Sequence, residues 1–247
     1  MTTLLGIDIG GSGIKGAPVD VRTGELLAPR YRLATPQPAT PNAVARVVAE
    51  VAKHFDWDGP IGATFPAVVR QGVVCTAVNV ARAWVGVDAA ELFTKRTAAP
   101  VTVINDADAA GIAEMEFGAG RGHLGTVLLV TLGTGIGSGL FVNGALAANT
   151  ELGHLQVRGK DAERRASDQV REQQGLSWRQ WAKRLNEYFA TVEAVLAPEL
   201  IIVGGGVSKK HEKFFPFLRA QAQIVPATLL NDAGIVGAAV AAHQAGH

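Results

Sequence analysis

The chain has 247 residues, of which 48% are hydrophobic and 18% charged, so it can form a core and lacks the composition of a disordered protein. Its 23 Lys and Arg residues and 22 Asp and Glu residues give a net charge of +1, which argues against a broad nucleic-acid or membrane surface. The single cysteine, Cys75, excludes an intramolecular disulfide and a multi-cysteine zinc site.

The first half of the chain alternates apolar runs with turn residues, which predicts an α/β fold. Residues 14–33 read as a continuing β-meander with a turn at 21–24. A helix is expected at 42–55, with Asn42 as its N-cap, and another at 107–117. Core strands are expected at residues 4–9, 14–19, 61–65 and 101–104.

The second half repeats the opening pattern of strand, glycine-rich turn and strand about 123 residues later. The repeat predicts a duplicated α/β fold with two lobes and a central cleft: a small lobe over 1–107, a larger one over 108–232, and a last helix at about 233–247 that packs back on the small lobe. The elements expected are strands at 126–132, 140–142 and 200–203 and helices at 177–196 and 234–243.

The first glycine-rich turn combines an acid, a hydroxyl and a cation within eight residues, in the order Asp8, Gly10, Gly11, Ser12, Gly13 and Lys15. Glycine turns can direct several backbone N–H groups at one anion, and Ser12 and Lys15 add side-chain donors. Asp8, at a strand end, could hold Mg²⁺ through water, because Mg²⁺ dehydrates reluctantly. The alternative is a glycine-rich hairpin with an incidental acid.

Two further glycine turns follow predicted strands, at Gly133-Thr134-Gly135 and Gly204-Gly205-Gly206. A dinucleotide-binding motif would need a helix after the glycines, but residues 140–142 read as a strand, so we reject a dehydrogenase. Three glycine turns at three strand ends predict phosphate binding more strongly than any one of them.

Asn105 and Asp106 lie between a predicted strand and a predicted helix, where open α/β sheets place ligands. Asp106 could accept a proton from a substrate hydroxyl, and Asn105 could hold neighbouring hydroxyls. A residue pair of this kind before a helix is more often a cap. Asp108 competes with Asp106, either as the base or as an acid favoured by the helix dipole.

Glu151 and His154 are three residues apart and could bind adjacent sugar hydroxyls. His154 has no local His or Cys companion for a metal, and a structural hydrogen bond is the alternative interpretation.

Together these segments resemble the ROK family of sugar kinases (repressor, open reading frame, kinase), within the actin-like ATPase superfamily. The resemblance implies the duplicated, ribonuclease H-like fold, with sugar and phosphoryl donor meeting in the cleft. It also implies that Asp106 is the general base and that the sugar contacts are Asn79, Asn105, Glu151 and His154.

One departure from the family concerns zinc. Many members carry a cysteine cluster after the Glu-Leu-Gly-His motif, and residues 158–167 of this chain contain no cysteine. No zinc is therefore expected, His154 is expected to act as a hydrogen-bonding group, and Glu163 is implied as a further sugar ligand.

The segments 151–184 and 207–210 resemble a narrower group within the family, the polyphosphate glucokinases. This likeness implies phosphoryl transfer from inorganic polyphosphate, or also ATP, to the 6-hydroxyl of glucose or mannose. Basic residues gather at 158–184 and at Lys209, Lys210 and Lys213, where they could bind a polyanion; the alternative is a solvated helix face.

Two other functions stay open: an ATP-only hexose kinase, and a non-catalytic sugar sensor on the same fold. Asp106, and the lack of a DNA-binding region before the first strand, weigh against the sensor. We expect a cytoplasmic protein with no membrane partner, because no signal peptide precedes the first strand and no apolar run reaches the roughly 20 residues of a membrane helix. The net charge argues against a nucleic-acid partner, and the resemblance to the ROK family implies a homodimer.

Overall fold

The structure is a computed structural model that describes residues 2–78 and 80–246. The chain forms two compact units: unit 1 extends to Ala113 and resumes at Asp232, and unit 2 is Glu114–Asn231. The boundary lies within helix α3 (Asp106–Phe117), and the chain returns to unit 1 just before helix α7 (Ala233–Ala245). Each unit is described separately below.

Unit 1 contains a mixed sheet in which β1 pairs antiparallel with β2 and parallel with β5, and β5 pairs parallel with β8. Its strands are β1 (Thr3–Ile9), β2 (Ile14–Asp20), β3 (Glu25–Leu26), β4 (Tyr31–Leu33), β5 (Ile61–Phe65) and β8 (Val101–Asn105). A separate small hairpin consists of β6 (Val69–Arg70) and β7 (Val73–Val74). The predicted meander over 14–33 is therefore split, because β3 and β4 each pair with β2.

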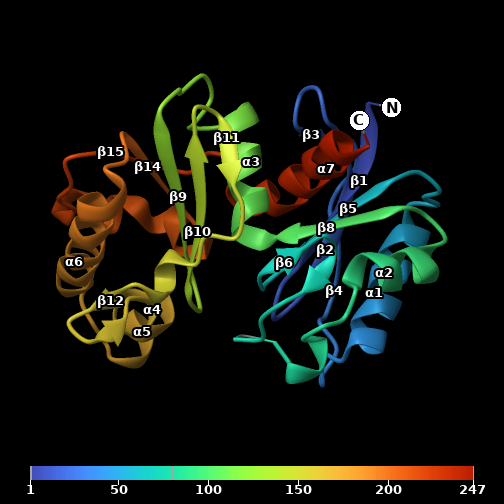
Figure 1. The fold of residues 1–247 in the computed structure, drawn as a ribbon, viewed down its shortest axis with the longest axis horizontal. Coiled ribbons are helices and arrows are strands. Elements are labelled where there is room, and N and C mark those ends of the chain that lie inside the picture. The colour runs from blue at the N-terminus through green and yellow to red at the C-terminus, as the bar shows by residue number, and fades with distance from the viewer. Residues whose placement is uncertain (1, 79, 247) are drawn as a thin grey trace. The chain divides into compact units, whose positions relative to one another are not determined.

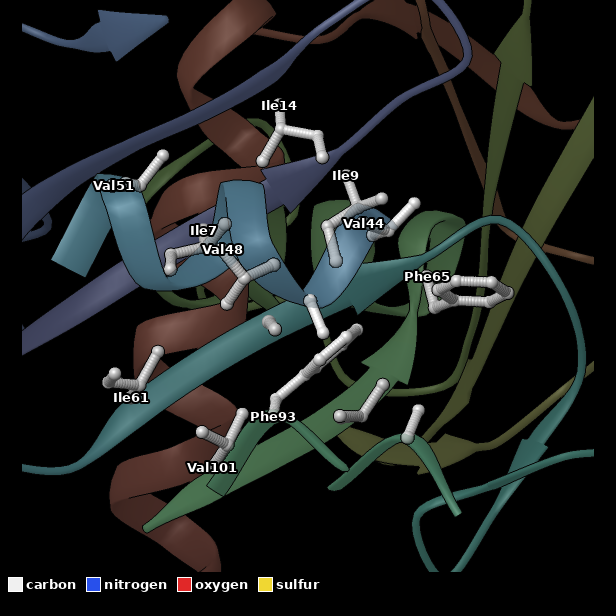
Figure 2. Packing of buried hydrophobic residues seen from close by; sticks show 14 of the residues in the cluster. Ile7, Ile9, Ile14, Val44, Val48, Val51, Ile61, Phe65, Phe93 and Val101 are labelled. Atoms are coloured by element: carbon white, nitrogen blue, oxygen red, sulfur yellow. The ribbon is translucent and has the colours of Figure 1, made fainter. Parts of the chain in front are cut away.

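One face of this sheet packs against α1 (Pro41–His54) and α2 (Ala89–Thr97) and forms the core of unit 1. Successive strand residues point to opposite faces, so Ile7 and Ile9 share this side with Val48 of α1 and Phe93 of α2. Figure 2 shows these side chains packed together. A short 3-10 helix (Arg82–Trp84) places Trp84 in the same core.

The opposite face of the sheet is covered by α7, drawn in red in Figure 1. Glycines on the strands allow this close approach. A Cβ on Gly6 would lie 2.0 Å from the Ile235 carbonyl oxygen, and one on Gly62 would lie 1.8 Å from that of Ala238. The strand glycines therefore determine how closely the helix packs on the sheet.

Unit 2 repeats the sheet of unit 1: β9 pairs antiparallel with β10 and parallel with β14, and β14 pairs parallel with β15. The strands are β9 (Thr126–Leu132), β10 (Ile136–Val142), β11 (Ala145–Ala147), β14 (Leu200–Gly204) and β15 (Gln223–Pro226). The first two strands of each sheet are seven residues long with almost the same alternation of buried positions. The repeat inferred from the glycine turns is thus present in the strand order of both units.

Helix α6 (Trp178–Leu196) supplies most of the helical side of the unit 2 core, through Trp181, Leu185 and Phe189. Ser177 begins it with a capping box that includes Gln180. The other elements of unit 2 are β12 (Gln156–Val157), β13 (Lys160–Asp161), α4 (Glu163–Ala166), α5 (Asp168–Gln173) and the 3-10 segments Leu152–His154, Gly206–Lys213, Phe215–Phe217 and Leu230–Asp232.

The predicted cap of the first helix is wrong by two residues. Thr40 caps α1, because its side chain accepts from the N–H of Ala43, and Pro41 occupies the first helical position, where no backbone donor is needed. Asn42 lies inside the helix. No helix in the described part of the chain is long and apolar enough to cross a membrane.

Candidate functional site

The carboxyl ends of three neighbouring parallel strands carry the polar residues of unit 1. Phe65 of β5 pairs with Asn105 of β8, and Ile7 of β1 pairs with Ala63 of β5. Asp8, Thr64, Asn105 and Asp106 therefore lie at the same edge of one sheet, where α/β sheets bind ligands.

Asp8 is held by a cation and a buried hydroxyl. Its Oδ2 lies 3.0 Å from Lys15 Nζ, and its Oδ1 accepts a 2.8 Å hydrogen bond from Thr64 Oγ1. Thr64 is fully buried and also accepts from the N–H of Ile9 at 3.0 Å. The carboxylate abuts Gly234 in the first turn of α7, where a Cβ would lie 2.8 Å from Asp8 Cγ. These contacts orient the carboxylate.

The glycine loop between β1 and β2 is braced from β4 and the residues after it. The loop closes on itself through a 3.0 Å hydrogen bond from Gly10 N–H to the Gly13 carbonyl. Thr35 Oγ1 donates to the Gly10 carbonyl at 2.5 Å, and Arg32 Nη2 donates to the Ser12 carbonyl at 2.9 Å. Two side-chain hydrogen bonds to backbone carbonyls therefore hold the tip of the hairpin in place.

Asn105 caps α3, so the capping alternative holds for this residue. Its Oδ1 accepts from the N–H groups of Ala107 and Asp108 at 2.9 and 3.1 Å, and its Nδ2 donates to the Ala67 carbonyl at 3.0 Å. Asp106 is half-buried at the start of the helix, whereas Asp108 is fully buried. Of the two acids, Asp106 is therefore the one that a substrate can reach.

The second and third glycine turns lie side by side in unit 2. Gly204 of β14 pairs with Thr131 of β9, and a Cβ on Gly205 would lie 2.3 Å from the Leu132 carbonyl oxygen. Gly205 has a φ of +83°, which glycine adopts without strain. The Gly133 carbonyl accepts from the N–H of Gln169, which links the second turn to α5.

The Glu151–His154 segment is fastened to β10. Ser138 Oγ donates to the Thr150 carbonyl at 2.5 Å and accepts from the N–H of Leu152 at 3.0 Å. Gly153 packs directly on β10, because a Cβ there would lie 2.2 Å from the Ile136 carbonyl oxygen. The two predicted sugar ligands are thus held on the strand that follows the second glycine turn.

His154 is surrounded by three carboxylates. Its Nδ1 lies 3.3 Å from Asp161 Oδ2 and 3.9 Å from Glu163 Oε1, and its Nε2 lies 3.8 Å from Glu151 Oε2. Burial raises the pKa of Glu151 and the Glu163 charge adds to this, whereas His154 lowers it. A hydrogen bond from Gln156 holds the pKa of Asp161 below its usual range. The imidazole of His154 is thus surrounded by carboxylates, of which Glu151 and Asp161 have pKa values shifted in opposite directions.

The described residues contain no group of three or more His, Cys, Asp or Glu side chains with the geometry of a metal site. Mg²⁺ commonly uses one or two protein carboxylates, with water and substrate phosphates as the remaining ligands. A single strand-end carboxylate such as Asp8 fits that ion.

Several basic residues of the 158–184 segment form ion pairs with acids. Arg158 and Arg165 both pair with Glu187, at 2.8 and 2.5 Å, and Arg171 pairs with Asp168 at 2.6 Å. Among the described residues, no acid lies within ion-pair distance of Lys160, Arg179, Lys183, Arg184, Lys209, Lys210 or Lys213.

Trp178 joins the two basic stretches. The Arg171 guanidinium lies 4.1 Å from its ring centroid, and Lys213 Nζ lies 5.9 Å from the same centroid. The indole also stacks on Phe214, with ring centroids 6.0 Å apart. One cation of each stretch, Arg171 and Lys213, therefore lies near the same indole ring.

The structure brings together the predicted residues within each unit. Asp8, Lys15, Asn105 and Asp106 lie at one sheet edge in unit 1, while the second and third glycine turns are neighbours in unit 2. Asn79 lies outside the described residues.

Sequence reasoning missed Thr64, Arg32 and Asp161, which contact the first turn or His154. Strand pairing could have indicated Thr64 and Arg32. Asp161 had no local signal, since its contact with His154 depends on the β12–β13 hairpin.

Comparison with known protein families finds a match to this chain. The model described as "ROK family" matches residues 4–169. The chain is 50% identical to the polyphosphate glucokinase of Mycobacterium tuberculosis (strain CDC 1551 / Oshkosh), over 96% of this chain and 89% of that protein.

Two solved structures are also similar. The inorganic polyphosphate/ATP-glucomannokinase of Arthrobacter sp. strain KM has a TM-score of 0.96 at 50% identity, covering 99% of this chain and 100% of that one. The ROK family glucokinase of Streptomyces griseus, in complex with glucose and AMPPNP, has a TM-score of 0.80 at 27% identity, covering 98% and 99%.

Proposed function

This chain belongs to the ROK family, and we propose that it transfers a phosphoryl group from inorganic polyphosphate to the 6-hydroxyl of glucose. The observation that carries this proposal is the 50% identity to a polyphosphate glucokinase along nearly the whole chain. The glycine turns and the acids at the sheet edge supply the kinds of groups that such a reaction needs.

The proposed fold is that of the actin-like ATPases, with the two units as its two lobes. The same strand order in both sheets supports the duplicated architecture.

Asp106 is the proposed general base. It takes the proton of the glucose 6-hydroxyl as that oxygen attacks the terminal phosphorus, and the bond to the bridging oxygen breaks, so the shortened polyphosphate leaves with the bridging electron pair. The half-buried position of Asp106 and the full burial of Asp108 support this choice. Asn105 fixes the start of α3 and therefore the backbone that carries the base.

The sugar is held by hydroxyl-binding side chains on both units. The proposed set contains Asn105 of unit 1, Glu151, His154 and Glu163 of unit 2, and Asn79. Ionised Glu151 and Glu163 accept hydrogen bonds from hydroxyls, and the imidazole of His154 donates or accepts according to its tautomer. The fastening of residues 150–153 to β10 supports a preorganised site.

The donor phosphates are proposed to lie at the three glycine turns, where backbone N–H groups and Lys15 neutralise charge. Asp8 holds Mg²⁺ through water in this proposal, and the ion when bound offsets the charge of the phosphoryl group. Exposed Lys209 and Lys210 follow the third turn and extend the cationic surface for a longer chain.

ATP is a second candidate donor, because the Arthrobacter relative bears both donors in its name. The test is glucose 6-phosphate formation by the purified chain with polyphosphate or ATP, repeated with mannose. Product from polyphosphate supports the proposal, and product from ATP alone would replace it by an ATP-only hexose kinase. Sugar binding without product from either donor would favour a sensor.

A further inference from the structure

A second cation, Arg32, lies at the first glycine turn beside Lys15. We propose that Arg32 is a donor-binding residue of this turn, which holds the loop through Ser12 and neutralises charge on the terminal phosphates of the donor. This inference rests on the proposed function, since it assigns an anionic phosphate donor to the turn.

The position of Arg32 is determined by strand pairing. Arg32 of β4 lies opposite Lys15 of β2 in the antiparallel register, so two cations are direct cross-strand neighbours beside the turn. The Arg32 side chain reaches back over the loop and donates to the Ser12 carbonyl at 2.9 Å. Arg32 thus contacts the turn at residues 10–13, whose backbone N–H groups are proposed to bind phosphate.

Gly13 provides the space for the guanidinium. A Cβ on Gly13 would lie 2.5 Å from Arg32 Nε and 2.6 Å from both Cζ and Nη2. The planar guanidinium therefore lies against the glycine face of the loop. Gly13 does not have a positive φ, so its backbone conformation does not require glycine. The close approach of the Arg32 side chain explains why glycine occupies this position.

The charge at the turn is unbalanced. Asp8 pairs with Lys15 at 3.0 Å, whereas no acid of residues 2–78 and 80–246 lies within ion-pair distance of Arg32. Arg32 is also exposed, so it can exchange water for a phosphate oxygen. A guanidinium carries five donors, and the Ser12 bond leaves others for a phosphate.

The test compares Arg32→Met, which keeps length and removes charge, with Arg32→Lys, which keeps the charge. We expect Arg32→Met to raise the KM for polyphosphate and the Kd for inorganic tripolyphosphate about tenfold or more, the usual effect of losing a charge-assisted hydrogen bond. Arg32→Lys should recover to within about threefold of the parent. Glucose affinity and the thermal midpoint should stay unchanged in both.

Gly13→Ala tests the same contact from the other side. The added methyl group displaces a flexible side-chain end, so the variant should fold and weaken tripolyphosphate binding as Arg32→Met does. Because both changes remove one interaction, the double variant Gly13→Ala/Arg32→Met should bind as weakly as either single variant. Fully additive losses would contradict the proposal.

Arg22→Ala is the matched control, because Arg22 is an exposed arginine after β2 that pairs with Asp20 away from the turn. It should bind tripolyphosphate like the parent. The proposal is overturned if Arg32→Met binds within about twofold of the parent, or if Arg32→Lys is as impaired as Arg32→Met while folded. If the parent uses only ATP, the proposed donor is wrong, and the same variants measured with ATP still decide the role of Arg32.

Discussion

At the scale of single residues, two acids in the first turn of α3 differ in exposure. This difference indicates which of them can act as the general base. Asp108 is fully buried, and the Asn105 side chain accepts from its backbone N–H at 3.1 Å. Asp106 is half-buried and precedes it on the same helix. Because a general base must come within hydrogen-bond distance of the hydroxyl it deprotonates, accessibility favours Asp106.

Asp106→Asn should lower kcat by about 10²–10⁴-fold, because the amide cannot accept the hydroxyl proton. Glucose Kd and the thermal midpoint should change little, which calorimetry and thermal unfolding can establish. Glu116→Gln is the control, since Glu116 is an exposed acid on the same helix and should keep full activity. A kcat of Asp106→Asn near that of the parent, with the fold intact, would rule out the assignment.

At the scale of elements, glycines set the distance between α7 and the sheet it covers. Gly6 on β1 and Gly62 on β5 meet helix carbonyls, and Gly237 on α7 meets α3, where a Cβ would lie 1.7 Å from the Ala109 carbonyl oxygen. Backbone atoms cannot rotate away as side chains do. The strands that carry Asp8 and Thr64 near their ends, and the helix that begins with Asp106, are therefore packed against one common helix.

Gly62→Ala should lower the free energy of unfolding by about 3 kcal/mol, because its methyl group would overlap the Ala238 carbonyl and force α7 to shift. Urea or thermal unfolding measures the change. Gly59→Ala is the matched control: its Cβ would find its nearest neighbour at 3.5 Å, in ordinary contact with Trp57, so the change should be within about 0.5 kcal/mol. Equal stability of both variants would show that α7 does not pack this closely.

At the scale of the whole molecule, a net charge of +1 conceals an uneven distribution. Glu187 pairs with both Arg158 and Arg165, and Asp168 pairs with Arg171. The exposed lysines after the third glycine turn have no such partners among the described residues. A local cationic surface of this kind binds a polyanion even when the net charge is close to zero.

Lys209→Ala/Lys210→Ala should raise the KM for long-chain polyphosphate more than the KM for ATP, because a long chain extends beyond the site of one triphosphate. The slope of log KM against log salt for long chains should fall by about one to two units, by analogy with other polyanions. Lys53→Ala/Lys95→Ala, which removes two charges from α1 and α2, serves as the control. An equal effect on both donors would argue against a polyphosphate surface.

Local chemistry predicted the regular elements well. Strands 61–65 and 126–132 have the predicted bounds, and the helix predicted at 177–196 begins one residue later, at Trp178. The cap of α1 was mispredicted because Asn42 and Thr40 are both good cap residues, and Pro41 between them decides in favour of Thr40. The roles of the site residues remain predictions.

The sequence alone determined the strands, the glycine turns, the repeat and the acids after strand ends, because each depends on residues close together in the chain. Only the tertiary structure decided which of these groups meet. Asp8 and Thr64 are 56 residues apart and meet because β1 and β5 pair in parallel. Arg32 reaches Ser12 because β4 pairs with β2, and Glu163 comes near His154 because β12 and β13 turn the chain back. Such contacts depend on strand register and helix packing, which no local pattern specifies.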